Sequence, residues 1–167
     1  MKRFLIVFLS FMFIIIIILL AIWKIFPIKH KALIVKYSEQ FDLSPELVSS
    51  IIKTESGFDS DAVSEMGAVG LMQILPSTAT EIAGKLGINT YDLYNPEDNI
   101  KFGCYYLKYL LNYYKGDIVY SLCAYNAGLN NVSYWDFGGD VDKVPISQTK
   151  NYVKKVLRNQ KIYKLYY

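Results

Sequence analysis

A helical pattern of apolar side chains that ends in a carboxylate constrains the fold of this chain more than any other feature. Ser44 suits the cap of a helix and Pro45 its first position. At helical period, one apolar stripe then contains Leu47, Val48, Ile51 and Ile52, and the other face contains Ser49, Ser50, Lys53 and Thr54. Such a stripe is stable only when it is buried against other elements, so we expect this helix to pack into a core.

Glu55 lies inside the apolar stripe, where a charged side chain is unexpected. Gly57 follows and predicts the end of the helix, so Glu55 also lies in the last turn, where the macrodipole disfavours negative charge. Both effects would raise its pKa. A glutamate near a helix end is usually solvated, but a residue that breaks two local rules often marks a functional site. Glu55 is therefore a candidate catalytic acid.

The rest of the chain beyond the N-terminal segment also reads as helical, since no stretch alternates convincingly with period two. The first of these helices would pack through Ala32, Leu33, Val35 and Phe41. Asn95, Asp117 and Ser147 are expected helix caps. We expect helices over 29–41, 76–87, 96–114, 117–128 and 148–165, with a loop over 57–70. The predicted fold class is all-α, in a compact, non-repeating arrangement.

Residues 4–23 form an apolar segment of twenty residues without a charge. As a helix this segment would be ~30 Å long, which matches the hydrocarbon core of a bilayer. A secretory signal peptide is the alternative, but the run is long and no small-x-small cleavage site follows it. We expect an uncleaved membrane anchor, or uncleaved signal, over 1–28 and a catalytic domain over 29–167. Lysines flank both ends, so charge alone leaves the orientation open.

Charge and cysteine usage exclude several classes of function. Beyond Pro27, the 15 acidic residues are matched by 15 basic ones, because three of the 18 in the chain precede it, and this balance argues against nucleic acid as a partner. Cys104 and Cys123 each lie in an apolar helical pattern, so small core residues are favoured over a disulfide. With His30 as the single histidine, we expect no metal and no cofactor.

Three ordered motifs follow the carboxylate. The first runs from Glu55-Ser56-Gly57-Phe58 to Gly70-Leu71-Met72-Gln73-Ile74 and Pro76-Ser77-Thr78, the second is Asn95-Pro96-Glu97-Asp98-Asn99-Ile100, and the third is Ala124-Tyr125-Asn126-Ala127-Gly128. Over roughly residues 34–156 the chain resembles the lytic transglycosylases of the lysozyme-like superfamily, both soluble and membrane-anchored. The resemblance implies a goose-type-lysozyme-like helical fold with a substrate groove across it.

The resemblance also implies roles for particular residues. Glu55 would be the sole catalytic acid. Residues implied to bind substrate or border the acid are Ser64, Met72, Gln73, Thr78, Tyr125, Asn126 and Tyr152. Two positions depart from the family pattern: Leu75 stands where many members have a second Met, and Gln148 where many have a supporting Glu. The second departure bears on fine positioning or rate, and the reaction type is unaffected.

The implied activity is cleavage of the β-1,4 bond between N-acetylmuramic acid and N-acetylglucosamine in peptidoglycan, with a 1,6-anhydro product. The implied partners are glycan strands and, through the N-terminal helix, the bacterial cell membrane, with the domain on the extracytoplasmic side. Cell-wall or secretion-apparatus proteins are unknown as partners. Lysozyme-like hydrolysis and a catalytically silent glycan-binding module are the alternatives. Most glycosidases use two carboxylates, but the nearby Asp59, Asp61 and Glu65 read as solvated loop charges.

Two further features have open interpretations. Tyr134 and Trp135, like Tyr125 and Tyr152, could line sugar subsites, whereas the tyrosines along 105–114 are more typical of packing or of a surface. The last helix carries six basic residues and no acid. A solvated face explains this composition, and attraction to anionic lipid headgroups or wall polymers is the functional alternative.

Overall fold

The protein is a set of helices with irregular connections. The computed structural model describes the backbone of residues 2–167 and the side chains in that range except those at positions 2, 19, 21 and 23. Its elements are α1 (Lys2–Ile25), α2 (Lys31–Gln40), α3 (Pro45–Glu55), α4 (Pro76–Leu86), α5 (Pro96–Tyr113), α6 (Ile118–Ala127), α7 (Leu129–Val132), the 3-10 turn η1 (Val141–Lys143) and α8 (Ser147–Tyr163). Within residues 2–167 there is no regular strand, only isolated bridges joining Val63 to Val69 and Val69 to Ile74. The all-α prediction is confirmed.

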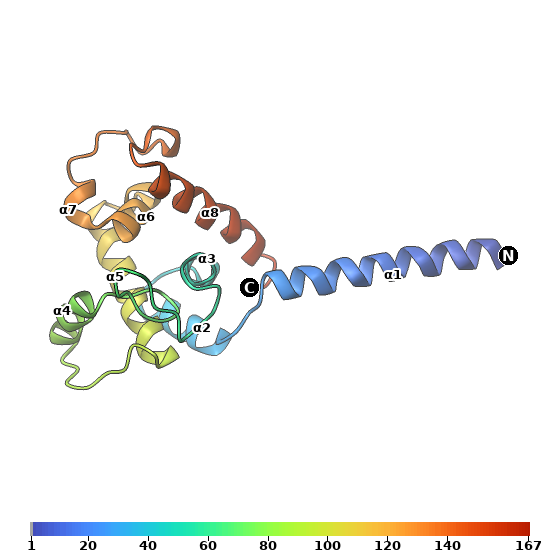
Figure 1. Ribbon diagram of the computed structural model, residues 1–167, viewed down its shortest axis with the longest axis horizontal. Helices are drawn as coiled ribbons and strands as arrows, with labels where there is room; N and C mark the ends of the chain where they lie inside the picture. The colour runs from blue at the N-terminus through green and yellow to red at the C-terminus, as the bar shows by residue number, and fades with distance from the viewer. Residues whose placement is uncertain (1) are drawn as a thin grey trace.

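Helix α3 lies between α8 and α2, with α5 and α4 further from α1 (Figure 1). Its most extensive packing is against α8, and it also contacts α2. The stripe predicted from the sequence, Leu47, Val48, Ile51 and Ile52, is buried in the core. On the far side, α5 packs against α2, α4 and α6. Because α8 and α2 cover α3, the side chain at its C-terminal end, Glu55, lies mostly inside the domain.

Two of the predicted helix caps are confirmed by hydrogen bonds. The Asn95 side chain accepts a bond from the Glu97 amide at the start of α5, and the Asp117 carboxylate accepts from two amides of α6. Ser44 occupies the cap position of α3 without a side-chain bond. The prediction of Ser147 as a cap is wrong, because Ile146 caps α8 and Ser147 is its first residue.

Two burial predictions are also wrong. Ser49 and Ser50, placed on the outer face of α3, are fully buried. Their hydroxyls are satisfied locally: Ser50 Oγ donates to the Leu47 carbonyl at 2.7 Å, and Ser49 Oγ lies 2.8 Å from the hydroxyl of Tyr167. In and next to α2, Ala32 is exposed, whereas Leu33 and Phe41 pack partly buried against the core as predicted, and Ile34 and Tyr37 are buried in it.

Cys104 on α5 and Cys123 on α6 are both free and buried. The interpretation of these residues as small core side chains is therefore confirmed. Burial raises the pKa of both thiols, that of Cys123 to about 11. Thiols with raised pKa are poor nucleophiles at neutral pH, so neither is a candidate for covalent chemistry.

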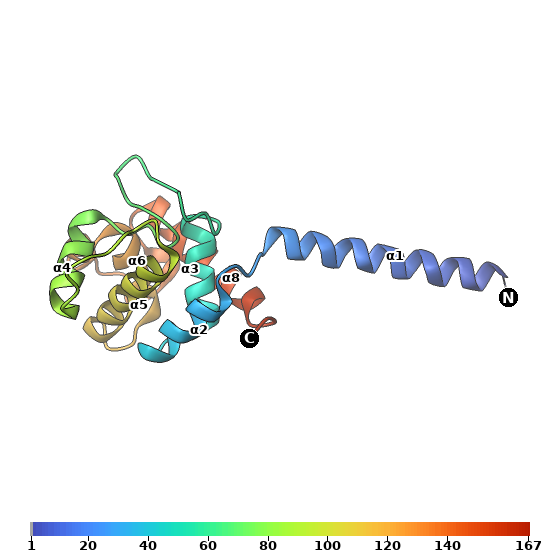
Figure 2. The same cartoon turned by 90° about the horizontal axis from the view of Figure 1, so that it is seen from below.

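Helix α1 projects away from the rest of the molecule in both views (Figures 1 and 2), and its described side chains are largely exposed. No helix among the described residues is both long and apolar enough to cross a membrane. The segment 4–23, which the sequence predicts as a membrane span, includes positions 19, 21 and 23, whose side chains lie outside the described residues.

The glycine-rich loop between α3 and α4 is held in place by one buried amide. Asn99 of α5 is fully buried, and its Oδ1 accepts a bond from the Met72 amide at 2.7 Å. Its Nδ2 donates to the carbonyls of Val69 and Leu93, both at 2.8 Å. Gly70 allows this close approach, because a Cβ there would lie 2.3 Å from Asn99 Nδ2, and its φ of +79° also favours glycine. The loop thus depends on Asn99 and Gly70 together.

Replacing Gly70 with alanine should destabilise the protein more than the same change at Gly67. Both glycines have similar positive φ, but a Cβ at position 67 would meet nothing within 4 Å. We expect Gly67→Ala to lower the free energy of unfolding by about 1 kcal/mol through backbone strain. We expect Gly70→Ala to lower it by a further 1–3 kcal/mol or so, because Asn99 must move. Urea unfolding of the two variants measures the difference, and equal losses would contradict the steric argument.

Candidate active site

Three helices bring an acid and two tyrosines together. Glu55 is the last residue of α3, Tyr125 lies in the final turns of α6, and Tyr152 lies in the second turn of α8. Burial raises the pKa of both tyrosines, and the negative charge of Glu55 raises each of them further. The structure therefore places these three of the predicted site residues beside one another, although they are far apart in the sequence.

Glu55 is a mostly buried acid with a displaced pKa. Burial raises the pKa of its carboxyl from 4.5 to about 7, while a hydrogen bond from Tyr152 and the positive charge of Lys155 offset part of that rise. The direction agrees with the prediction from the apolar stripe. At neutral pH such a group is present in both protonation states, so it can donate a proton in one step and accept one in the next.

The two tyrosines next to Glu55 have different roles. The Tyr125 hydroxyl donates to the Met72 carbonyl at 2.9 Å, which ties α6 to the glycine-rich loop. The Tyr152 hydroxyl is buried and, among the described residues, has no partner at good hydrogen-bond geometry. It nevertheless lies near enough to the Glu55 carboxyl to lower the pKa of that acid. Tyr152, and not Tyr125, is therefore the tyrosine whose hydroxyl can donate a hydrogen bond to the Glu55 carboxylate.

Met72 does not lie where the resemblance implies a substrate contact. Its side chain is fully buried against Gly103, where a Cβ would come within 2.3 Å of Met72 Sδ. What Met72 contributes is its backbone: the amide bonds to Asn99, and the carbonyl accepts from Tyr125. The Met72 peptide groups thus position the loop, and a substrate-binding role for Met72 stays a prediction.

Gln73 is held in an unusual conformation. Its φ of 51° lies in the left-handed region that non-glycine residues rarely adopt. The side-chain Nε2 donates to the carbonyls of Gly70 at 2.9 Å and Ala62 at 3.1 Å, and these bonds hold the turn. Backbone strain of this kind costs about 1–3 kcal/mol and is often found at functional sites.

Ser64 and Asn126 join neighbouring segments through hydrogen bonds. Ser64 Oγ accepts from the Ala68 amide at 3.0 Å, which closes the turn that precedes Gly70. Asn126 Oδ1 accepts from the hydroxyl of Thr149 at 3.0 Å, which links α6 to the start of α8. Gln148, the departure from the family pattern, is exposed beside the buried Thr149.

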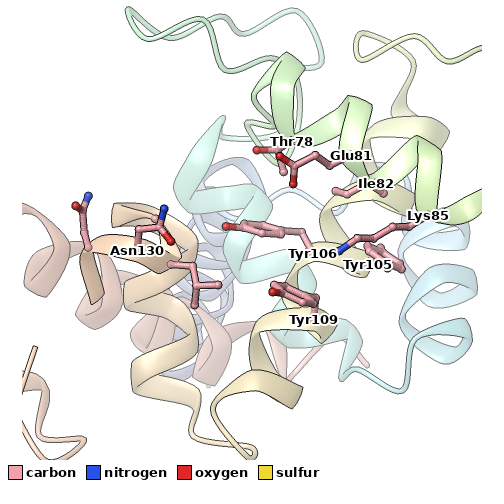
Figure 3. A pocket seen from close by; sticks show the side chains of 11 residues that line it. Thr78, Glu81, Ile82, Lys85, Tyr105, Tyr106, Tyr109 and Asn130 are labelled. Carbon is pink, nitrogen blue, oxygen red and sulfur yellow. The ribbon is translucent and has the colours of Figure 1, made fainter. Parts of the chain in front are cut away.

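A groove of about 490 Å³ lies between α4, α5 and the residues around α7 (Figure 3). Figure 3 shows Thr78 and Glu81 of α4 on one side, Asn130 on the opposite side and the tyrosines of α5 between them. The lining residues are Thr78, Glu81, Ile82, Lys85, Tyr105, Tyr106, Tyr109, Gly128, Leu129, Asn130 and Asn131. Thr78 thus lies in a groove, as the resemblance implies.

The groove is connected to the acid through two packed aromatic rings, which are tilted relative to each other. Glu55 itself is not a lining residue, but Tyr106 of the groove packs on Tyr125 with ring centroids 5.5 Å apart. The sequence predicts that the tyrosines of α5 pack or lie at a surface; three of them, Tyr105, Tyr106 and Tyr109, line the groove. Tyr134 and Trp135, named as alternatives for sugar subsites, do not line this groove.

Sequence reasoning missed two residues that shape the site. Asn99 was noted only as part of a motif at a helix start, although an amide inside the apolar pattern of α5 signals a buried hydrogen-bonding role. Lys155 was noted only as part of a basic helix; it lies three residues after Tyr152 and therefore on the same face of α8. Asp59, Asp61 and Glu65 are exposed, as expected for solvated loop charges.

Comparison with known proteins agrees with this geometry. Residues 32–138 match the family model described as "Transglycosylase SLT domain". The chain belongs to this family. The matched range ends before α8, so the placement of Tyr152 and Thr149 beside the matched part of the chain rests on the structure.

Three relatives show the extent of the similarity. The SLT domain is 33% identical over 151 residues to the soluble lytic murein transglycosylase of Salmonella typhimurium, covering 83% of this chain and 23% of that one. It is 31% identical over 166 residues to membrane-bound lytic murein transglycosylase C of Actinobacillus pleuropneumoniae, covering 81% and 46%. The crystal structure of the 70 kDa soluble lytic transglycosylase of Escherichia coli superposes with a TM-score of 0.78 at 32% identity, covering 84% and 25%.

The coverages show how much of each relative this chain matches. The chain spans about a quarter of the length of the soluble relatives that it matches. The shared part is the SLT domain, and at this level of similarity the predicted lytic-transglycosylase fold is confirmed.

Removing the Tyr152 hydroxyl should raise the pKa of Glu55. NMR titration of the Glu55 carboxyl should give a pKa of about 7 in the wild type, and a higher value in Tyr152→Phe, because the lost hydrogen bond favours the ionised form. Tyr114→Phe is the matched control, since it also removes a buried tyrosine hydroxyl, but one that does not contribute to the pKa of Glu55. A fall in the Glu55 pKa in Tyr152→Phe would contradict this assignment.

Proposed function

We propose that this SLT domain is a peptidoglycan lytic transglycosylase that cleaves the β-1,4 bond between N-acetylmuramic acid and N-acetylglucosamine. The observation that carries the proposal is one acid, Glu55, whose pKa is raised to about 7 by burial beside two tyrosines, one of which packs on Tyr106 of the tyrosine-lined groove. Relatives over most of the chain are named lytic murein transglycosylases, which supports the choice of substrate and reaction.

The reaction follows from what one acid can do alone. Glu55 in its protonated form donates to the glycosidic oxygen, and the bond from that oxygen to C1 of N-acetylmuramic acid breaks. The 2-acetamido oxygen of the same sugar attacks C1 in place of an enzyme carboxylate. The C6 hydroxyl then displaces it, giving its proton to Glu55 and closing the 1,6-anhydro ring, so no water is consumed. The starting form of Glu55 predominates below about pH 7 and is lost above it, so the rate should fall as pH rises through this value.

The neighbours of Glu55 suit both proton transfers. Burial favours the neutral acid that the first step needs, while Tyr152 and Lys155 favour the carboxylate that the second step needs. These opposing influences keep the pKa close to neutral. A catalytic acid of this kind contributes ~10²–10⁴ in rate.

Replacing Glu55 should slow turnover severely, whereas replacing the loop carboxylates Asp59 and Glu65 should not. The protein acting on purified peptidoglycan should release muropeptides that end in 1,6-anhydro-N-acetylmuramic acid, identified by mass spectrometry. Glu55→Gln should lower the rate by ~10²–10⁴ because the proton donor is lost. Asp59→Asn and Glu65→Gln are matched controls that should retain the rate, since both side chains are exposed.

The same experiment separates the alternatives. Products that end in a reducing sugar, heavier by one water, would identify a lysozyme-like hydrolase. Wall digestion that is equally absent from the wild type and from Glu55→Gln would favour a silent glycan-binding module.

The groove tyrosines should contribute to substrate binding by stacking on sugar rings. Tyr109→Ala should raise KM about 2–10-fold with a smaller change in kcat, because an aromatic contact is worth ~0.5–1.5 kcal/mol. Tyr113→Ala is the matched control: it lies one turn further along α5, is exposed, and does not line the groove. Equal KM values for the two variants would show that glycan does not occupy this groove.

We also propose that residues 4–23 anchor the chain in the bacterial cell membrane as a single span, with the SLT domain on the extracytoplasmic side, where peptidoglycan lies. The support is the charge-free sequence, the helical conformation of this segment and the exposure of its described side chains away from the domain. A relative named as membrane-bound is consistent with such a location. Retention of the full chain in vesicles after an alkaline carbonate wash tests the anchor.

A further inference from the structure

The C-terminal end of α8 is fastened to the segment that follows α1. The Tyr163 hydroxyl donates to the Pro27 carbonyl at 3.0 Å, and the Phe26 ring meets the Tyr163 ring edge-on at 6.0 Å. Lys31 Nζ donates to the Tyr166 carbonyl at 2.8 Å. Figures 1 and 2 accordingly show the C-terminus beside the end of α1 that faces the domain. Residues 24–31 and 161–167 therefore form one surface, which we call the basic corner.

The basic corner carries cations and an exposed apolar tip. Its lysines are Lys24, Lys29, Lys31, Lys161 and Lys164, all exposed. None of the ion pairs among the described residues includes them, and no acid occurs in residues 24–38 or 143–167. Glu46 is an acid that faces this corner, through Tyr167. Leu165 is 85% exposed among these lysines.

We propose that the basic corner binds the anionic phospholipid headgroups of the membrane that α1 enters. This inference rests on the proposed membrane anchor. Helix α1 ends at Ile25, so a membrane that encloses α1 has its interface at the basic corner. Lysines near an anionic surface each strengthen binding about fivefold, which is ~1 kcal/mol converted at room temperature. Leu165 and the tyrosines beside it suit the interfacial layer, where aromatic side chains gather.

We favour a lipid surface over a wall polymer as the binding partner, because the basic corner directly follows the end of α1. The lysines come from the end of α1, the segment after it and the end of α8, and the bonds of Tyr163 and Lys31 join these segments. A flexible polyanion would need no such alignment with the end of an apolar helix. Binding of headgroups would also fix the orientation of the domain, because α3 packs along α8 and carries Glu55 at its end.

The test uses the full chain in vesicles of phosphatidylcholine, with or without phosphatidylglycerol. A nitroxide label at Leu165→Cys reports how accessible this position is to a nickel chelate dissolved in water. A label at Tyr134→Cys is the matched control, because Tyr134, two residues after the end of α7, is 89% exposed. The buried Cys104 and Cys123 leave the introduced thiol as the accessible one. The Lys161→Gln and Lys164→Gln pair removes two charges from the basic corner, and Lys101→Gln with Lys115→Gln removes two elsewhere.

We expect the label at 165 to be shielded from the chelate only in vesicles with phosphatidylglycerol, while the label at 134 stays accessible. The double variant Lys161→Gln, Lys164→Gln should lower the ratio of shielded to accessible label about 25-fold, at about fivefold for each lysine. The control variant Lys101→Gln, Lys115→Gln should leave this ratio unchanged. A label at 165 as accessible as that at 134 in both lipids would overturn the inference and leave the anchor standing. Shielding by added poly(glycerol phosphate) but not by anionic vesicles would also overturn it, in favour of wall polymers. Loss of the chain in the carbonate wash would overturn the anchor and this inference together.

Discussion

The buried amide of Asn99 is the interaction on which the rest of the site depends. Its three hydrogen bonds hold the loop around Gly70 at fixed positions, with the Met72 amide among its partners. The carbonyl of Met72 then receives the Tyr125 hydroxyl, and Tyr125 lies beside Glu55. A buried amide left without partners costs about 1–3 kcal/mol for each unmet group, so the loop and α5 are stable only in this one arrangement. The surroundings of the acid are therefore set by a residue on a different helix.

The charge state of Glu55 reflects a balance between opposing influences. Burial at the end of the central helix favours the neutral acid, whereas Tyr152 and Lys155 favour the carboxylate. Both of these partners belong to α8, the helix that packs most extensively on α3. The packing of α8 on α3 therefore brings in the groups that limit the rise in the pKa of Glu55. An acid balanced in this way suits a reaction in which one group acts first as acid and then as base.

Local sequence signals predicted the helices and the acid well. The caps at Asn95 and Asp117, the apolar stripe of α3 and the raised pKa of Glu55 all depend on residues close together in the chain. What could not be predicted depends on distant partners. Ser49 and Ser50 lie opposite the stripe, yet they are buried, because a helical period identifies one apolar face without indicating how many neighbours cover the helix. Met72 reads as a groove residue in its motif but packs inward against Gly103, a contact between segments thirty residues apart.

The turn at Gln73 determines which polar atom of that side chain is left for other partners. Both hydrogens of its amide nitrogen are committed to the carbonyls of Gly70 and Ala62. The oxygen Oε1 is then the polar atom of this side chain that remains available, and it can accept a hydrogen bond but cannot donate one. A glutamate of the same shape would direct negative charge at two carbonyl oxygens and open the turn. The main chain thus fixes the hydrogen-bonding polarity that this side chain presents to its surroundings.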